Sequence, residues 1–256
     1  MLVTQTILIG ILYFISQMDG FFGTSLIGRA IIMGPLTGLI MGDVASGVMI
    51  GGTLELAFIG AVSIGAYDPP DVASGTILGT AFAIKAGAGP EVAIAMGLPV
   101  STIMQTVIAI AWGLLPTLFM HRADAFAEKG DAKGDSRNMF VAGFAPIVAV
   151  FWIVPAAYYF GSDAVVNLLG NIPEFITTGM DIAAGIIPAI GFAMLAEMIM
   201  NKKVAPFFFL GFFLIQYFGI GTTAVAIFAV IIAIVIVQLS SNQPQTKQEE
   251  DGFDDF

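Results

Sequence analysis

Four carboxylates stand within a segment that is otherwise built mostly of glycine and apolar residues. Asp43, Glu55, Asp68 and Asp71 all fall between residues 42 and 71. A charged side chain inside a membrane is costly unless it faces a protein cavity, water or a partner, so such residues usually handle a solute. A buried carboxylate can accept two hydroxyl groups in short, charge-assisted hydrogen bonds. The pattern therefore predicts a binding site for a hydroxyl-bearing solute within a membrane protein.

Glu55, at the end of a Gly-Gly-Thr-Leu-Glu segment, is the first candidate ligand of this site. Its carboxylate could accept hydroxyl groups of the solute, with Thr53 or Gln17 supplying a donor. It could instead pair with a base, because a buried charge without a partner is strongly destabilising. Arg29 and Lys85 are the candidate bases, so both are expected to support the site.

The three aspartates also have a structural alternative. Asp68 and Asp71 flank two prolines, which break a helix and free backbone groups. Both aspartates could contact the solute, and both could instead cap helix N-termini. Asp43 follows a glycine and precedes a helical run, which favours an N-cap near the site. Gln17 and Asp19, at the end of the first apolar run, could form a polar wall of the cavity or lie at the membrane interface.

The elements that must position these residues are short and interrupted in the first third of the chain. Before about residue 90, glycines and prolines cut the apolar runs, and such interrupted segments point to the binding region of a transporter. Later apolar stretches reach the length of about 20 residues that crosses a bilayer. We therefore predict an all-α polytopic membrane protein with broken or re-entrant helices in the first third and long transmembrane helices after about residue 91.

Composition supports the membrane assignment. The chain is 57% hydrophobic and 11% charged, with a mean hydropathy of +0.93, whereas soluble domains carry about 25% charged residues. Many of its acids gather at the C-terminal end, which is typical of a solvated tail. We expect three regions: a site region at 1–90, long transmembrane helices at 91–240 and an acidic, disordered tail at 241–256.

The basic residues predict an orientation. Segments 121–138 and 201–204 contain lysine and arginine and are expected to be cytoplasmic loops. Segment 161–181 has acids but no base, so we expect it outside. One further span, 205–239, would then carry the C-terminal tail outside as well.

Residue counts exclude several chemistries. Without cysteine the chain has no thiolate metal site, and its one histidine, His121, makes a histidine-based metal site untenable. No phosphate-binding loop is present, so we expect no cofactor, no metal, no nucleic-acid partner and no catalytic residue. His121 and Arg122 suit the headgroup level or a docking contact with a partner protein.

The order of these motifs resembles enzyme IIC, the membrane subunit of the mannose-fructose-sorbose class of sugar phosphotransferase systems. The Gly-Gly-Thr-Leu-Glu segment preceded by Gly42 and Asp43 is the most specific part of the resemblance, which extends to about residue 239. Other matching segments are Ile64-Gly65-Ala66, Pro69-Pro70-Asp71, His121-Arg122-Ala123-Asp124, Ile172-Pro173-Glu174-Phe175 and Pro206 to Phe212. Within the class, residues 69–84 look nearest to the N-acetylgalactosamine-type members.

The resemblance implies a sugar permease subunit of the bacterial cytoplasmic (inner) membrane. Such a subunit moves a hexose or N-acetylated amino sugar inward for phosphorylation by a IIB partner, in a phosphoenolpyruvate-dependent system. The implied partners are an enzyme IID membrane subunit and the histidine-phosphorylated IIA and IIB phosphocarriers, in a lipid-embedded hetero-oligomer for which a trimer is one arrangement. The chain would belong to a phosphotransferase complex without carrying the phosphoryl group itself.

The residues alone leave two other functions open. In an ion-coupled secondary transporter, Glu55 and Asp68 would couple protons or sodium. In a scaffold subunit, the partner would bind the sugar. The sparsity of charged residues in the later spans argues against ion coupling, and the carboxylate-rich first third argues against a scaffold.

Overall fold

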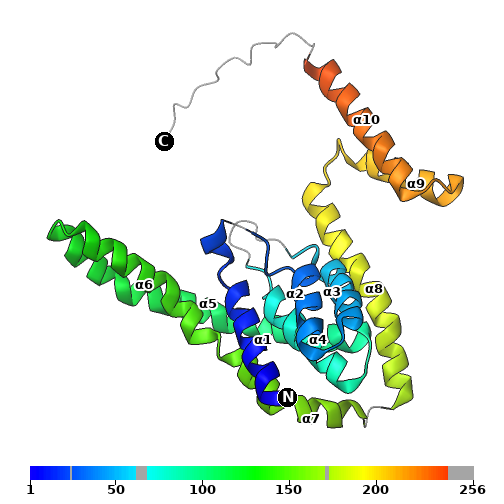
Figure 1. Ribbon diagram of the computed structural model, residues 1–256. Coiled ribbons are helices and arrows are strands. Elements are labelled where there is room, and N and C mark those ends of the chain that lie inside the picture. The colour runs from blue at the N-terminus through cyan, green and yellow to red at the C-terminus, as the bar shows by residue number, and fades with distance from the viewer. Residues whose placement is uncertain (24, 62–67, 171–172, 242–256) are drawn as a thin grey trace. The chain divides into compact units, whose positions relative to one another are not determined.

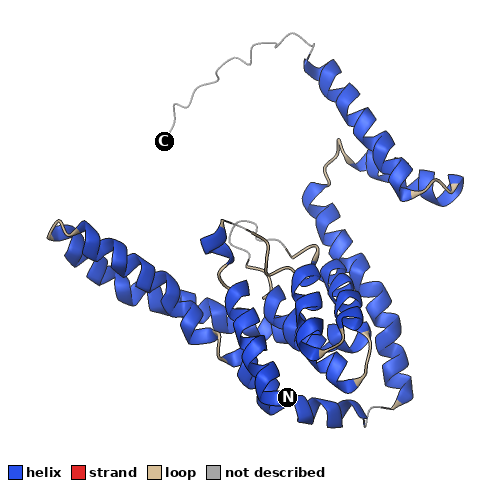
Figure 2. Cartoon of the chain, viewed as in Figure 1, coloured by secondary structure: helices blue, strands red, loops and turns tan. Residues whose placement is uncertain are grey.

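The computed structural model describes residues 1–23, 25–61, 68–170 and 173–241. Throughout these ranges the regular structure is helical and no strand occurs (Figure 2), which confirms the all-α prediction. The chain forms two compact units, Met1–Glu197 and the residues from Met198 onward. Apart from Ser241, the expected acidic tail lies outside the described residues.

Figure 1 labels the helices along the chain. Within the first unit lie α1 (Leu2–Ser16), the 3-10 helix η1 (Asp19–Phe22), α2 (Ala30–Met41), α3 (Val44–Phe58), α4 (Val72–Ala86), α5 (Pro90–Glu128), α6 (Ala132–Val150), α7 (Ile153–Gly170) and most of α8 (Glu174–Ile199). The second unit holds α9 (Ala205–Phe218) and α10 (Thr222–Ser241).

Helix length differs between the first third and the rest of the chain. The helices α1 to α4 have 15, 12, 15 and 15 residues, so each is at most about 22 Å long and falls short of a hydrocarbon core of about 30 Å. Three described helical segments are long and apolar enough to cross a membrane: Pro90–Glu128, Ala132–Val165 and Thr222–Leu239. The expected contrast between short and long helices is therefore present.

The helices α2 and α3 form a tight hairpin. Gly42 ends α2 in the left-handed region, at φ +89°, where glycine carries no steric penalty. Asp43 then caps α3, with its carboxylate accepting hydrogen bonds from the Ser46 amide at 3.0 Å and the Ser46 hydroxyl at 2.6 Å. These two bonds favour the charged form and lower the pKa of the Asp43 carboxyl. Asp43 is therefore the N-cap that its sequence context favoured.

Helix α4 lies at the centre of the first unit. It packs against α1, α2, α3, α5 and α7, and every residue from Ala73 to Ala83 is buried. Side chains added at Gly75 and Gly79 would collide with carbonyl oxygens of α5, at 2.5 and 2.6 Å. The backbones of α4 and α5 are therefore in direct contact. The boundary expected at residue 90 does not divide this packing, and the compact unit continues to Glu197.

Three segments differ from the sequence-based expectation. Segment 121–138 is not a loop, because α5 continues to Glu128 and α6 begins at Ala132. Segment 161–181 is also largely helical, with α7 reaching Gly170 and α8 starting at Glu174. The single span expected at 205–239 is two helices, because Gly219 adopts φ +62° and closes α9 with its amide bonded to the Ile215 carbonyl.

The hairpin of α2 and α3 generates a prediction about stability. A methyl group at Gly47 would lie 2.7 Å from the Gly34 carbonyl oxygen and 2.7 Å from the Gly38 Cα. Because both contacts are with backbone, Gly47→Ala should destabilise the protein by about 1 to 3 kcal/mol. The measurement is the thermal unfolding midpoint in detergent.

Gly52→Ala, in the same helix, is the matched control. A methyl group at Gly52 has no neighbour within 4 Å, so this change should be neutral or stabilising, because alanine favours helix over glycine. Equal midpoints for the two variants would contradict the close approach of α2 and α3.

Candidate functional site

A polar cavity of about 310 Å³ lies where α1 ends and α4 begins. Its wall comes from the end of α1, the segment leading into α2, the Pro-Pro segment with the start of α4, and Gln105 of α5. The polar and charged side chains that line it are those of Ser16, Gln17, Asp19, Arg29, Asp68, Asp71 and Gln105. The cavity therefore gathers carboxylates, amides and one guanidinium within an apolar fold.

Asp71 is fixed by hydrogen bonds from two helices. Its Oδ2 accepts bonds from the Tyr13 hydroxyl at 3.1 Å and from the Ser74 amide at 3.2 Å. Its Oδ1 accepts a longer bond, 3.4 Å, from Gln17 Nε2. The Asp71 amide also donates to the Ser101 carbonyl of α5 at 3.1 Å. Asp71 is thus the N-cap of α4, which was one of the two roles predicted for it. It also lines the cavity.

Asp68 is less constrained than Asp71. Its carboxylate is exposed and accepts a short hydrogen bond from Gln105 Nε2 on α5. Asp68, Pro70 and Gln105 also line an adjoining cavity of about 440 Å³ that extends along α5. Because a carboxylate has about four lone-pair positions, Asp68 retains acceptor capacity toward a solute.

Arg29 and Glu55 form an ion pair at the start of α2. Arg29 Nε donates to Glu55 Oε1 at 2.8 Å, and Arg29 Nη2 contacts the same oxygen. The other oxygen, Oε2, accepts the Ile31 amide at 3.2 Å. Arg29 lines the cavity, whereas Glu55 does not. Of the alternatives for Glu55, the structure contains the pairing with Arg29.

Thr53 and Lys85 lie away from the cavity. The Thr53 hydroxyl donates within its own helix to the Met49 carbonyl at 2.9 Å. Lys85 Nζ donates to the Ser162 hydroxyl at 2.6 Å and pairs with Asp163 at 2.8 Å. Lys85 is in the last turn of α4, at the end opposite Asp71. Of the two candidate bases for Glu55, Lys85 therefore pairs elsewhere, because another helix supplies its carboxylate.

Asp19 shapes the wall of the cavity beside Gln17. Its Oδ1 accepts hydrogen bonds from the Ser25 hydroxyl at 2.5 Å and the Ile27 amide at 3.4 Å. These bonds fold the segment between α1 and α2 back toward the end of α1. Both residues that the sequence suggested as a polar wall consequently line the cavity.

Two residues that donate hydrogen bonds to the aspartates of the cavity, Tyr13 and Gln105, were missed from the sequence. Tyr13 precedes Gln17 by one helical turn, so both side chains project from one face of α1. Gln105 is an isolated amide in the long apolar run of α5. These sequence positions were the only hints of a role in the site. The hydrogen-bond partners, Asp71 for Tyr13 and Asp68 for Gln105, are 58 and 37 residues away along the chain.

His121 and Arg122 are far from this cavity. Both are exposed near the C-terminal end of α5, about 24 Å along the helix from Gln105 at 1.5 Å per residue. Within the described ranges, no group of three or more histidine, aspartate or glutamate side chains is placed to hold a metal ion.

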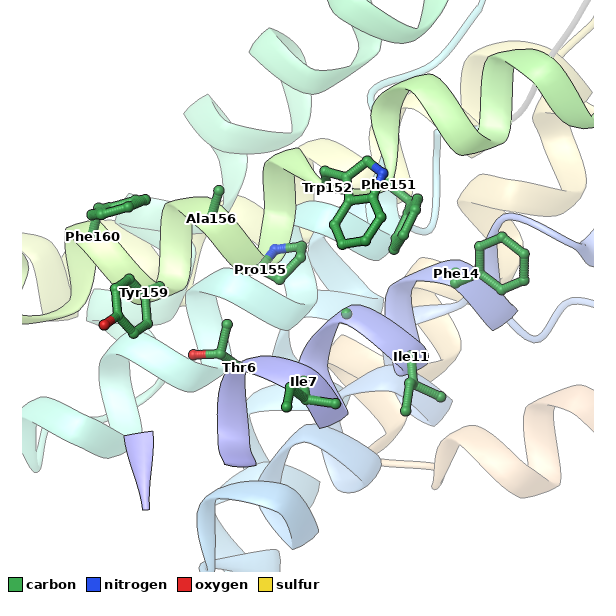
Figure 3. A pocket seen from close by; sticks show the side chains of 11 residues that line it. Thr6, Ile7, Ile11, Phe14, Phe151, Trp152, Pro155, Ala156, Tyr159 and Phe160 are labelled. Carbon is green, nitrogen blue, oxygen red and sulfur yellow. The ribbon is translucent and has the colours of Figure 1, made fainter. Parts of the chain in front are cut away.

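A second cavity, of about 640 Å³, has a different character. Figure 3 shows that its lining residues come from α1 and from α7 with the two residues before it. They include Trp152 and Pro155 from the second of these segments and Ile7 and Ile11 from α1. A lining of aliphatic and aromatic groups offers few hydrogen bonds to a hydrophilic solute, so this cavity suits hydrocarbon.

Comparison with known proteins identifies the family. The family described as "PTS system sorbose-specific iic component" matches residues 3–235. The chain belongs to this family. It is a multi-pass, sugar-translocating IIC subunit of a bacterial phosphotransferase system.

Two curated relatives of this IIC subunit act on different sugars by name. The sorbose-specific EIIC component of Klebsiella pneumoniae is 34% identical over 87% of this chain and 82% of its own length. The N-acetylgalactosamine permease IIC component 1 of Escherichia coli (strain K12) is 31% identical over 83% and 79%. The class predicted from the motifs is confirmed, and these identities do not separate one sugar from the other.

Two solved structures resemble this IIC subunit. A chain titled "Structure of membrane protein" has a TM-score of 0.82 at 29% identity and covers 94% of this chain and 98% of its own. A chain from the cryo-electron microscopy structure of the mannose transporter ManYZ with Microcin E492 has a TM-score of 0.57 at 29% identity, covering 91% and 94%. The polytopic α-helical fold is therefore that of known membrane proteins.

Asp71 generates a prediction that separates its structural role from its charge. Asp71→Ala removes the N-cap of α4 and the acceptor of the buried Tyr13 hydroxyl, so it should cost about 0.5 to 2 kcal/mol. Asp71→Asn keeps a carbonyl oxygen at the same position and should cost less. Thermal unfolding of the two purified variants tests this, and equal losses would show that charge rather than capping matters.

Proposed function

We propose that the polar cavity between α1, α4 and α5 is the sugar site of this IIC subunit. The observation that carries the proposal is the gathering of Asp68, Asp71, Gln17, Arg29 and Gln105 around one space within an apolar fold. A sugar ring presents several hydroxyl groups, and these five side chains supply both acceptors and donors for them.

The five side chains have different roles in this proposal. Asp68 is the principal acceptor, because its carboxylate is exposed and bonded only to Gln105 among the described residues. Arg29 offers those of its five N–H groups that do not face Glu55. Glu55 and Asp71 act mainly by position, the first holding Arg29 and the second holding the end of α4.

The substrate is a hexose or an N-acetylated amino sugar. Relatives named for sorbose and N-acetylgalactosamine bracket this range. A site that pairs hydroxyl groups rejects an analogue that lacks one, because a buried polar group is then left unpaired. Measuring the affinity of the purified protein for several hexoses and N-acetylated amino sugars would identify the substrate.

Transport coupled to phosphorylation requires partner proteins that carry the phosphoryl group, since this chain lacks a phosphate-binding loop. We propose a hetero-oligomer with an enzyme IID subunit, a trimer of such pairs being one arrangement, in the bacterial inner membrane. The similarity to a chain of the ManYZ transporter supports such a membrane complex. A IIB protein, itself phosphorylated by IIA, would phosphorylate the arriving sugar. The exposed His121 is a candidate contact for docking of IIB.

The sugar site can be tested with Asp68→Asn. Losing a charge-assisted acceptor should weaken sugar binding by about 1.5 to 3 kcal/mol with little change in volume. Sugar affinity of the purified complex and phosphorylation of sugar by the complete system are the measurements.

Asp43→Asn is the matched control, because it removes one exposed carboxylate that does not line the cavity, and asparagine also caps helices well. It should leave sugar affinity unchanged. Unaltered affinity in Asp68→Asn, with the protein folded, would remove Asp68 from the site.

The proposed orientation places the tip of the α5–α6 hairpin and segment 201–204 in the cytoplasm, and the end of α7 outside. With 14 residues, α9 is too short to cross alone, so α10 would be the last crossing and would carry the tail outside. Because the chain contains no cysteine, single cysteines report directly on topology.

Ser136→Cys should therefore react with a membrane-impermeant thiol reagent only from the cytoplasmic side, and Ala164→Cys and Gln245→Cys only from outside. Ser136 and Ala164 are exposed, so the reagent can reach both positions. Labelling in whole cells and in inverted vesicles provides the comparison. The reverse pattern would overturn the orientation, and cytoplasmic labelling of Gln245→Cys alone would relocate the tail.

A further inference from the structure

The α5–α6 hairpin contains a second polar pocket near its tip. The pocket is about 220 Å³ and lies between Arg122 and Phe126 of α5 and Arg137 and Asn138 of α6. Asn138 Nδ2 donates to the Phe119 carbonyl at 2.9 Å and ties the two helices together at this level. The Arg122 guanidinium lies 5.8 Å from the centre of the Phe119 ring. Two cationic side chains from different helices thus line one pocket.

The charge of this pocket is not balanced by its lining. The pocket has two arginines and no carboxylate among its lining residues. In the part of the chain that the structure describes, the ion pairs are those of Arg29 with Glu55 and Lys85 with Asp163. Arg122 and Arg137 therefore have no acidic partner there, although each is a strong donor for oxyanions.

None of the four acids of the hairpin, Asp124, Glu128, Asp131 and Asp135, lines the pocket. Asp124 is two positions after Arg122, and Asp135 is two positions before Arg137. Two positions correspond to a rotation of about 200° around a helix, so these carboxylates project away from the arginines. Asp131 caps α6 by accepting the Gly134 amide at 2.9 Å. The hairpin is therefore near neutral as a whole but positive within the pocket.

An exposed apolar surface begins next to this pocket. Leu114 and Leu118 of α5 are 62% and 66% exposed, and Phe140 and Val141 of α6 are 61% and 47% exposed. In a membrane protein such a surface contacts acyl chains or another apolar segment. A positive pocket at the boundary of an apolar helix face matches the two parts of a phospholipid.

We propose that this pocket binds the phosphate group of an anionic phospholipid, such as phosphatidylglycerol. Arg122 and Arg137 donate N–H groups to the phosphate oxygens, in the forked geometry that guanidinium groups form with phosphate. The acyl chains run along the exposed apolar faces of α5 and α6. Basic pockets between transmembrane helices on the cytoplasmic side bind anionic headgroups in this way.

The choice of an anionic lipid follows from the charges. Two unpaired guanidinium groups favour a ligand with net negative charge over a zwitterionic headgroup, whose own cation would enter the same positive field. The bound lipid would join α5 to α6 where the hairpin leaves the bilayer, and this role is independent of the sugar site.

The experiment uses the full-length chain with its membrane partner, purified and stripped of lipid. The thermal unfolding midpoint is followed on titration with phosphatidylglycerol, phosphatidylcholine or inorganic phosphate. We expect a saturable increase with phosphatidylglycerol only. Arg122→Gln combined with Arg137→Gln should weaken this response roughly 30-fold.

Lys129→Gln combined with Lys133→Gln is the matched control. It removes the same charge from the same hairpin, but neither lysine lines the pocket. It should leave the response to phosphatidylglycerol intact. Because both arginines are exposed, the arginine variant should fold. Native mass spectrometry of the unaltered protein gives an independent measurement, in which phosphatidylglycerol should be retained in preference to phosphatidylcholine.

Several outcomes would overturn the proposal. Equal effects of the arginine and lysine variants would show that the response depends on the general surface charge of the hairpin and not on the pocket. An equal response to inorganic phosphate would indicate a site for a free anion. Loss of IIB binding in the arginine variant with an unchanged lipid response would make the pocket a protein-docking site. Equal retention of the two lipids in the mass spectrum would also refute it.

Discussion

One carboxylate, that of Asp71, joins three of the helices around the polar cavity. Its side chain caps α4 and accepts the hydroxyl of Tyr13 from α1, while its amide donates to the Ser101 carbonyl of α5. In an apolar environment each of these groups would be costly without a partner. Satisfying the end of α4 therefore also sets the distance between α1 and α5, and with it the width of the cavity.

Small residues make this arrangement possible. Gly75 and Gly79 allow the α4 backbone to touch that of α5, and Gly34 and Gly47 do the same between α2 and α3. The contact between α4 and α5 has a consequence for transport. A movement of residues 1–90 against the later helices would have to separate α4 from α5. If the moving helices were divided at another place in the first unit, the contact between α4 and α5 would stay intact.

Local features of the site could be predicted from the sequence, whereas its long-range partners could not. The caps formed by Asp43 and Asp71 depend on residues three positions later, so their sequence context was sufficient. For Glu55 the sequence offered two bases, Arg29 and Lys85, and only the fold shows that Lys85 is taken by Asp163, 78 residues away. Gln105 was missed for the same reason, because an isolated amide in an apolar helix does not indicate which distant carboxylate it meets.

The length of α5 explains where the cavity lies. With 39 residues the helix is about 58 Å long, nearly twice the thickness of a hydrocarbon core of about 30 Å. Its first half packs on α4, at Gly97 and Ser101, and its second half packs on α6, at Phe119. Gln105 lies between these two halves and contacts Asp68. A displacement of the α5–α6 hairpin relative to α4 would consequently be transmitted to the Gln105–Asp68 hydrogen bond, which connects the membrane-crossing part of the helix to the carboxylate proposed to hold the sugar.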